Sequence, residues 1–320
     1  MNWLLNRLYN LNEHPIPRFA FLGTTNWMRA LSLLVCEGDF TNQALRNTYL
    51  TVQRRVPNQE ADTLAFGYLL MALHNVASIN KSKETNEPYA LVRSVIVAWY
   101  YSIYYASKAM IAATSGSDPQ THSKTAKIWQ SEIIQQNDVV VFPFNLNIND
   151  LTPNNVIQKI AALRENNSFD LNTVPTNHDQ ALGAAISYLK GTAEYQRESI
   201  ENEVRTSRAF LDLGVDNFRS NNAKALRDDK LRLAHVNILV QAFRYRGKAN
   251  YRDAIYLSYG PDYSETLHLF INDMAEVANA FTLMASHYIS RRVTTENWQN
   301  FTEDLLENAR FELPIDILEV

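Results

Sequence analysis

Residues 97–110, VAWYYSIYYASKAM, constrain the fold of this chain most, because one Trp and four Tyr stand together with no charge before Lys108. The apolar residues of the surrounding segment, 88–115, recur at helical spacing on more than one face. A helix that is apolar nearly all round has to be covered on most of its sides. We therefore predict a central helix whose tyrosine hydroxyls find partners at its margins, with stacking on nucleic-acid bases as the functional alternative.

Low glycine and proline contents extend the helical prediction to the whole chain. Only 9 Gly and 10 Pro occur among 320 residues, whereas sheet-rich proteins use Gly in many of their turns. Helical periodicity dominates the sequence, and the predicted fold class is all-α. The predicted helices cover residues 25–36, 41–55, 59–80, 88–115, 119–137, 153–165, 178–214, 222–258, 263–291 and 295–310.

These helices are predicted to form two helical-bundle halves. Residues 1–137 form the N-terminal bundle, and residues 178–320 form the C-terminal bundle, which ends in an apolar tail. The connector between them, 138–177, is rich in Asn, Pro and Thr and is expected to be irregular. Within the connector, VVVFPF at 139–144 is the one predicted short strand, and Pro143 would end it or hold it at a sheet edge.

Charge and cysteine content restrict the function classes. The formal net charge is −4, so nucleic-acid binding would need a local basic patch. Cys36 is the only cysteine, which excludes an internal disulfide and a cysteine-based metal cluster and suits a reducing cytoplasm. The longest uncharged apolar-rich run, between Arg93 and Lys108, is too short to span a bilayer. We expect a cytoplasmic protein without a membrane partner.

The helical hairpin expected at 88–137 carries a family resemblance. Residues 93–129 contain a Tyr-Tyr pair in an aromatic helix, the Ala-rich YYASKAM, a short turn and then PQTHS at the start of the next helix. This segment resembles the central hairpin of HEPN (higher eukaryotes and prokaryotes nucleotide-binding) domains. The resemblance implies a helical bundle with a frequent role in prokaryotic toxin–antitoxin or antiviral defence systems. It also implies RNA binding or metal-independent ribonuclease activity without a cofactor, while some family members are non-catalytic binding modules.

The resemblance does not include a complete catalytic motif. Catalytic members carry an Arg, four to six residues and then a His, usually combined across a dimer; only Arg7 and His14 have that spacing here, outside the hairpin. The chemistry needs a His to move a proton from a 2′-hydroxyl and an Arg to stabilise charge on the phosphorane. We take His122, at the THS position of the hairpin, and His235 as candidate catalytic residues. The structural alternative for His122 is a first-turn helix residue with local hydrogen bonds.

The segment FRYRGKANYRDAIYLSYG, 243–260, supplies the best candidate for binding a phosphate backbone. On a continuous helix, three of its cations recur every four residues with two tyrosines beside them, a pattern that suits phosphates and bases. The predicted nucleic-acid-binding residues are Arg244, Lys248, Arg252, Tyr245 and Tyr251. The alternatives are a solvated face or ion pairs with the acidic helix at 194–203, and a helix break at Gly247 would change the geometry.

No metal site and no cofactor is expected from the motifs. Glu265 and His268 form the only Glu-x-x-His sequence, whereas a di-iron bundle needs two such motifs and further Glu ligands. The sequence also lacks a Gly-rich phosphate loop and the motifs of zinc and serine hydrolases. Hydrolysis of nucleoside triphosphates and metal-dependent hydrolysis are therefore poorly supported.

Two function hypotheses follow. The first is an HEPN-like protein that recognises RNA or another nucleic acid and, if it is an enzyme, is a metal-independent endoribonuclease. The second is a non-enzymatic helical scaffold or adaptor subunit of a larger assembly. The incomplete catalytic motif, the acidic net charge and the apolar tail FELPIDILEV at 311–320 favour the second, although that tail could also pack on its own domain. Both hypotheses expect a protein partner or a homodimer.

Overall fold

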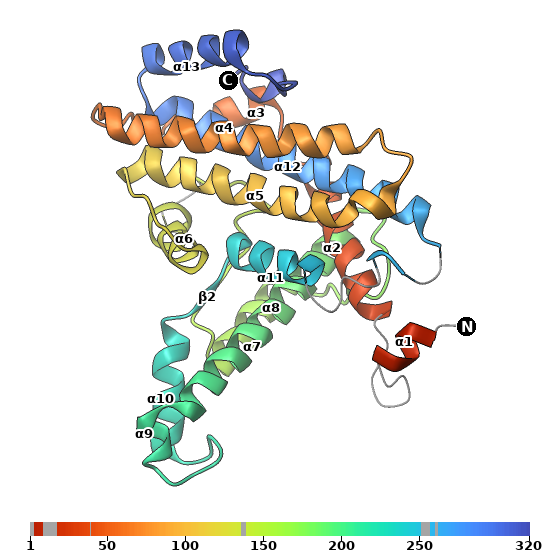
Figure 1. Cartoon of the computed structure of the whole chain (residues 1–320). Coiled ribbons are helices and arrows are strands. Elements are labelled where there is room, and N and C mark those ends of the chain that lie inside the picture. The colour runs from red at the N-terminus through yellow and green to blue at the C-terminus, as the bar shows by residue number, and fades with distance from the viewer. Residues whose placement is uncertain (1–2, 9–17, 39, 136–138, 251–256, 260–261) are drawn as a thin grey trace.

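The structure, a computed structural model, describes residues 3–8, 18–38, 40–135, 139–250, 257–259 and 262–320. Helices dominate this part of the chain, which confirms the predicted all-α fold class (Figure 1). The first elements are α1 (Trp3–Leu8), α2 (Arg18–Cys36), α3 (Asn42–Thr48), α4 (Gln59–Ser82), α5 (Pro88–Ser115), α6 (His122–Ile128) and a π-helical turn (Trp129–Ile134). Then follow β1 (Ile148–Asn149), α7 (Pro153–Arg164), α8 (His178–Thr206), α9 (Arg208–Leu211), α10 (Asn221–Arg232), β2 (His235–Val236), α11 (Ile238–Asn250), α12 (Ser264–Arg292), α13 (Thr295–Asn308) and a 3-10 turn (Ile315–Ile317).

Helices α2, α4, α5 and α12 form the body of the molecule, in which α5 is central (Figure 1). α5 packs against α4, α12 and α11, and it buries Trp99, Tyr100 and Ile103. Its bounds are those predicted, because Pro88 occupies the first helical turn and Gly116 ends the helix in the left-handed conformation at φ 77°. The prediction of a covered central helix is therefore confirmed.

One hydrophobic core holds residues from both sides of the connector. The ring of Trp27 in α2 stacks on that of Tyr188 in α8, with a centroid distance of 4.0 Å. Trp99 of α5 meets Tyr245 of α11 edge to face, with centroids 5.3 Å apart. α12 also packs against α4 and α5. The domain boundaries at residues 137 and 178 stay predictions, and the two halves they define share this core.

A narrower arm extends from the body (Figure 1). We define it as α7, α9, α10 and the C-terminal part of α8, whose N-terminal part packs against α2. Its buried residues fall into small clusters, one that includes Val156, Ile160 and Leu231 at the base and one around Val204 and Phe210 at the tip. Since stabilisation grows with buried apolar area, the arm is held less firmly than the body.

The predicted strand at 139–144 is wrong. These residues form turns that bury Val140 and Phe144 in the main core, and the Phe144 N–H donates to the Val141 carbonyl. Pro143, which has no N–H, cannot contribute a donor to a sheet. The short strand of the connector is instead β1, which pairs antiparallel with β2.

The predicted helices 222–258 and 119–137 also need correction. Between α10 and α11 the chain leaves the helical conformation so that β2 can pair with β1, and α11 then continues through Gly247. The second predicted helix starts only at His122, because Thr121 caps it by accepting a hydrogen bond from the Lys124 N–H. The first correction divides one predicted helix into two with β2 between them, and the second moves the start of a helix. Both leave the all-α architecture unchanged.

The apolar C-terminal tail packs on the chain itself. Ile317 and Leu318 are buried, and the 3-10 turn that contains Ile317 contacts α12. Within the described ranges, we find no helix whose length and apolar character would let it cross a membrane.

Candidate nucleic-acid interface

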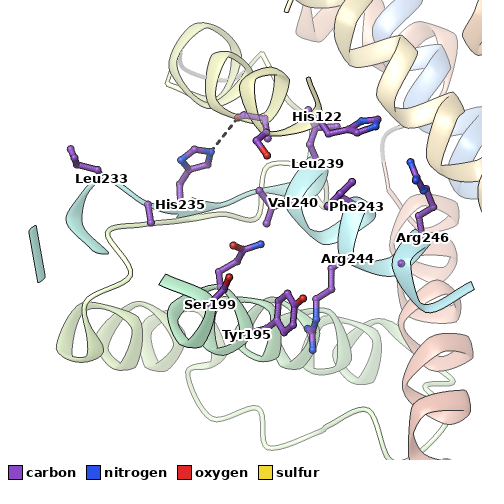
Figure 2. Close-up of a pocket in the computed structure, with 15 residues that line it drawn as sticks. His122, Tyr195, Ser199, Leu233, His235, Leu239, Val240, Phe243, Arg244 and Arg246 are labelled. Atoms are coloured by element: carbon purple, nitrogen blue, oxygen red, sulfur yellow. Dashed lines mark hydrogen bonds between the residues drawn. The ribbon is translucent and has the colours of Figure 1, made fainter. Parts of the chain in front are cut away.

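A cleft with a cavity volume of about 880 Å³ opens where the arm joins the body (Figure 2). Residues of α6, α8, α11 and the chain around β2 form its walls, and we call it the α11 cleft. Its lining includes His122, His235, Tyr195, Phe243, Arg244 and Arg246, together with the uncharged polar residues Ser123, Gln196 and Ser199. No described residue of this lining is Asp or Glu. The α11 cleft is therefore a local cationic site in a chain whose net charge is negative.

Asn237 fixes the start of α11 against α6. Its Oδ1 accepts hydrogen bonds from the N–H groups of Leu239 and Val240, as an N-terminal cap does. Its Nδ2 donates to the Ala126 carbonyl at 3.0 Å and to Gln130 Oε1 at 3.1 Å. Because Asn237 is fully buried, these bonds hold α11 and the α6 segment in one rigid arrangement.

Three consecutive residues of α11 point in different directions. Successive helical residues are rotated by about 100°. Tyr245 points into the core and is 0% exposed, and its hydroxyl donates to the Thr24 carbonyl at 2.7 Å. Arg244 and Arg246, on either side of it in sequence, reach opposite sides of α11 (Figure 2). The buried tyrosine thus anchors the helix, while both cations stay at the cleft.

Arg244 lies against aromatic rings of α8. Its guanidinium carbon is 5.1 Å from the ring centroid of Tyr195 and 5.5 Å from that of Tyr188. One of its N–H groups donates to Thr192 Oγ1 at 3.0 Å. These contacts orient the side chain. No ion pair involves Arg244 in the described part of the chain, although Glu194, Glu198 and Glu201 line an adjoining pocket that Arg244 also lines.

Arg246 lies against aromatic rings of α5. Its guanidinium carbon is 5.1 Å from the ring centroid of Tyr100 and 5.6 Å from that of Tyr101, and Nη1 donates to the Tyr101 hydroxyl at 3.4 Å. A third ring, that of Phe243, is 5.7 Å away. Arg246, like Arg244, is held by aromatic rings and one hydroxyl group. Most of its N–H donors therefore stay available for a ligand.

His122 stands between α5 and α11. Its Nδ1 is 2.6 Å from the Tyr100 hydroxyl, and its ring centroid lies 5.2 Å from that of Phe243. Burial lowers the pKa of His122, and the positive charges of Arg246 and Lys108 lower it further. Burial also raises the pKa of the Tyr100 hydroxyl far above its ordinary value. At neutral pH, the pair is therefore a neutral imidazole hydrogen-bonded to a protonated phenol.

His235 lies on β2, at the other end of the cleft (Figure 2). Its Nε2 is 3.2 Å from the Ala126 carbonyl, and since a carbonyl only accepts, Nε2 carries the proton. Burial lowers the pKa of His235 and Lys127 lowers it further, although the bond to Ala126 opposes this. The neutral ring thus has an unprotonated Nδ1, which is a base.

The structure brings together some of the predicted site residues. His122, His235 and Arg244 line the same cleft, although they are far apart in the sequence. The prediction that Tyr245 binds nucleic acid is wrong, because its ring is buried among core aromatic residues. Tyr251 and Arg252 lie outside the described residues, as do the side chain of Lys248 and His14 of the Arg–His spacing.

Sequence reasoning missed Arg246, Phe243 and Tyr195. A search for cations every four residues passes over Arg246, which is two residues from Arg244. Tyr195 stands in a charged stretch of α8 that reads as an outer face. The Arg-Tyr-Arg sequence at 244–246 is the signal that could have identified Arg246. If the tyrosine of such a sequence is buried, the arginines on both sides of it lie at the surface of the helix.

The described residues include no group of three or more His, Cys, Asp or Glu side chains placed to hold a metal ion. Searches against protein-family models, curated proteins and solved structures found no match to this chain. The HEPN resemblance therefore stays a prediction, and a functional argument has to start from the α11 cleft itself.

Proposed function

We propose that the α11 cleft binds RNA and that the chain is an HEPN-like nucleic-acid-interacting protein. One observation carries the proposal: Arg244 and Arg246 enter a cleft in which no described lining residue is a carboxylate. Arg246 forms no ion pair in the described part of the chain, and a cation that no carboxylate balances attracts phosphate groups. Arg244 also lines an adjoining pocket with Glu194, Glu198 and Glu201, so its share of this attraction is smaller. The chain has a net charge of −4, so this attraction is local and does not come from the molecule as a whole.

Aromatic rings beside the cations favour a nucleic acid over a simple inorganic anion. Phe243 and Tyr195 both line the cleft, and both side chains are exposed. Exposed rings next to arginines provide stacking surfaces for bases together with donors for phosphate.

The enzymatic form of the proposal is RNA cleavage without a metal ion. Nδ1 of His235 would accept the proton of a 2′-hydroxyl while that oxygen attacks the adjacent phosphorus. The imidazolium would then return the proton to the departing 5′-oxygen, and an arginine would stabilise the charge of the phosphorane. The lowered pKa of His235 supports this form, because it keeps the ring neutral, with an unprotonated Nδ1, at neutral pH.

The alternative is an adaptor that binds without cleaving. Each histidine already uses one ring nitrogen on the protein, His122 on the Tyr100 hydroxyl and His235 on the Ala126 carbonyl. Such bonds are also typical of histidines that only shape a binding surface.

Fluorescence anisotropy with a labelled single-stranded RNA in EDTA tests the proposal. We expect Arg244→Ala and Arg246→Ala each to weaken binding about tenfold and to lower the salt dependence of the affinity by about one counterion. Arg219→Ala is the matched control, because Arg219 is exposed on the arm and away from the cleft. Equal affinity of all four proteins would refute the proposal.

The same samples distinguish the enzyme from the adaptor. Cleavage products that appear in EDTA and disappear in His235→Asn would support the metal-independent ribonuclease. Binding by the wild-type protein without any cleavage would support the adaptor.

A further inference from the structure

Two exposed aromatic rings stand in the α11 cleft, in contrast to the buried rings of the core. Phe243 is 44% exposed and Tyr195 is 53% exposed. Burying such a ring contributes substantial apolar free energy, so exposing one at a cleft leaves a surface that a flat apolar ligand can cover. Phe243 comes from α11 and Tyr195 from α8, so the two rings belong to different walls.

Each exposed ring has its own arginine. The guanidinium carbon of Arg246 is 5.7 Å from the Phe243 centroid, and that of Arg244 is 5.1 Å from the Tyr195 centroid. Both guanidinium groups are oriented by hydroxyls of the protein, Arg246 by Tyr101 and Arg244 by Thr192. A guanidinium has five donor hydrogens, so each keeps donors for a phosphate after these bonds are made.

The two ring–arginine pairs lie on opposite sides of α11. Arg246 extends toward α5, whereas Arg244 extends toward Tyr195 on α8 (Figure 2). Phe243 and Arg246 are three residues apart in the helix and therefore share a face. A chain of nucleotides laid across α11 would meet one pair and then the other.

The size of the cleft limits what it can hold. Its cavity of about 880 Å³ falls within the range of about 300–1,000 Å³ that is usual for small-molecule pockets. A duplex keeps its bases stacked inside, where their faces cannot meet a protein ring. Unpaired nucleotides present both a free face and a phosphate.

We propose that the α11 cleft takes two consecutive unpaired nucleotides, with one base on Phe243 and the next on Tyr195, while Arg246 and Arg244 hold the flanking phosphates. This inference rests on the proposed function and specifies the form of nucleic acid that the site selects. The recognised chemistry is a nucleoside phosphate with a free base face, which a free nucleotide or a single strand could supply.

Calorimetric titration of the whole chain with ligands of increasing length tests the inference. The ligands are uridine 5′-monophosphate, the dinucleotide pUpU, a tetrauridylate and a short RNA duplex. We expect pUpU to bind at least tenfold more tightly than the mononucleotide, because a second base is stacked. We expect the tetrauridylate to gain little more and the duplex to bind at least tenfold more weakly than pUpU.

Variants of the two rings distinguish base stacking from a purely structural role of these side chains. Phe243→Ala and Tyr195→Ala should each lower the affinity for pUpU roughly tenfold while leaving its salt dependence unchanged, because a ring neutralises no phosphate. Tyr195→Phe keeps the ring and should bind as the wild type does. Tyr259→Ala is the matched control, since Tyr259 is an exposed ring that does not line the cleft.

The possible outcomes separate this inference from the proposed function. Equal affinity for the mononucleotide and pUpU, or for pUpU and the duplex, would overturn the two-subsite arrangement. So would unchanged affinity in both ring variants, even if the arginine variants still weaken RNA binding. If neither arginine nor ring variants affect binding, the proposed function fails as well.

Discussion

The body and the arm are stabilised in different ways. In the body, rings from several helices pack together around Trp99, which is 0% exposed. At the tip of the arm, the buried cluster contains Val204, Phe210 and Ala223, with half-buried residues around them. The α11 cleft takes one wall from each region: α11 is anchored in the body by Tyr245, and Tyr195 comes from α8. The proposed ligand site thus takes one wall from the large core of the body and one wall from the arm, whose buried clusters are smaller.

The largest expected effect comes from removing the central indole of the body. Trp99→Ala should lower the free energy of unfolding by about 4 kcal/mol, because a fully buried ring is replaced by a cavity that the surrounding helices cannot fill. Urea denaturation monitored by circular dichroism measures this loss. Trp99→Phe keeps most of the side-chain volume and should lower the free energy of unfolding by clearly less than Trp99→Ala does. Similar losses in the two variants would contradict the role given to the ring.

A smaller and more local effect is expected in the arm. Phe210→Ala removes the largest buried side chain of the tip cluster, where it meets Phe218 at a centroid distance of 5.0 Å, and should cost about 3 kcal/mol. Since the tip makes no core with α4 and α5, the loss should appear as faster amide hydrogen exchange in α9 and α10. Exchange in α5 should stay as in the wild type. Faster exchange throughout the body would show that the two regions unfold together.

Local signals in the sequence were sufficient to predict the central helix of the body, but not the packing of α12 against α4 and α5 in one core. The aromatic stretch and the proline at the first turn lie within α5, and Gly116 follows its last turn. The predicted bounds of this helix are those of the structure. The interruption between α10 and α11 could not be predicted in this way. β2 pairs with β1, which lies far away in the sequence, and helical periodicity carries no information on such a non-local pairing.

The candidate site was predicted only in part, for the same reason. His122 and His235 were chosen separately, and their proximity depends on tertiary contacts such as the bond from Asn237 to the Ala126 carbonyl. Tyr245 was misplaced because periodicity locates a residue on a helix face but does not say which face packs against Trp27 and Trp99. The buried face of α11 is determined by its tertiary contacts with the other helices of the core.

The pH dependence of stability provides a third test of the difference between the body and the arm, with a smaller expected effect. Among the described residues, the buried side chains with a carboxylate, ammonium or imidazole group all lie in the body, namely Asp62, Lys108, Asp273 and His287. His287 of α12 is 2% exposed, and its Nε2 donates to Asn42 Oδ1 at 2.8 Å. Burial, together with the positive charges of Arg46 and Arg291, lowers the pKa of His287 to about 4. A fall in pH should therefore destabilise the body before it destabilises the arm.

The sign of the effect follows from proton uptake by the unfolded state. Below its ordinary pKa of 6.5, unfolded His287 binds a proton that the folded protein takes up only near pH 4, so stability falls through this window. From about pH 7 to about pH 5, this residue should cost about 2 kcal/mol of unfolding free energy. His287→Gln keeps an N–H donor for Asn42 and cannot titrate, so its stability should depend less on pH by that amount, as urea denaturation at several pH values would measure. His178→Gln, at an exposed position of α8, is the control. If both variants show the wild-type pH profile, the acid sensitivity of the body has another origin.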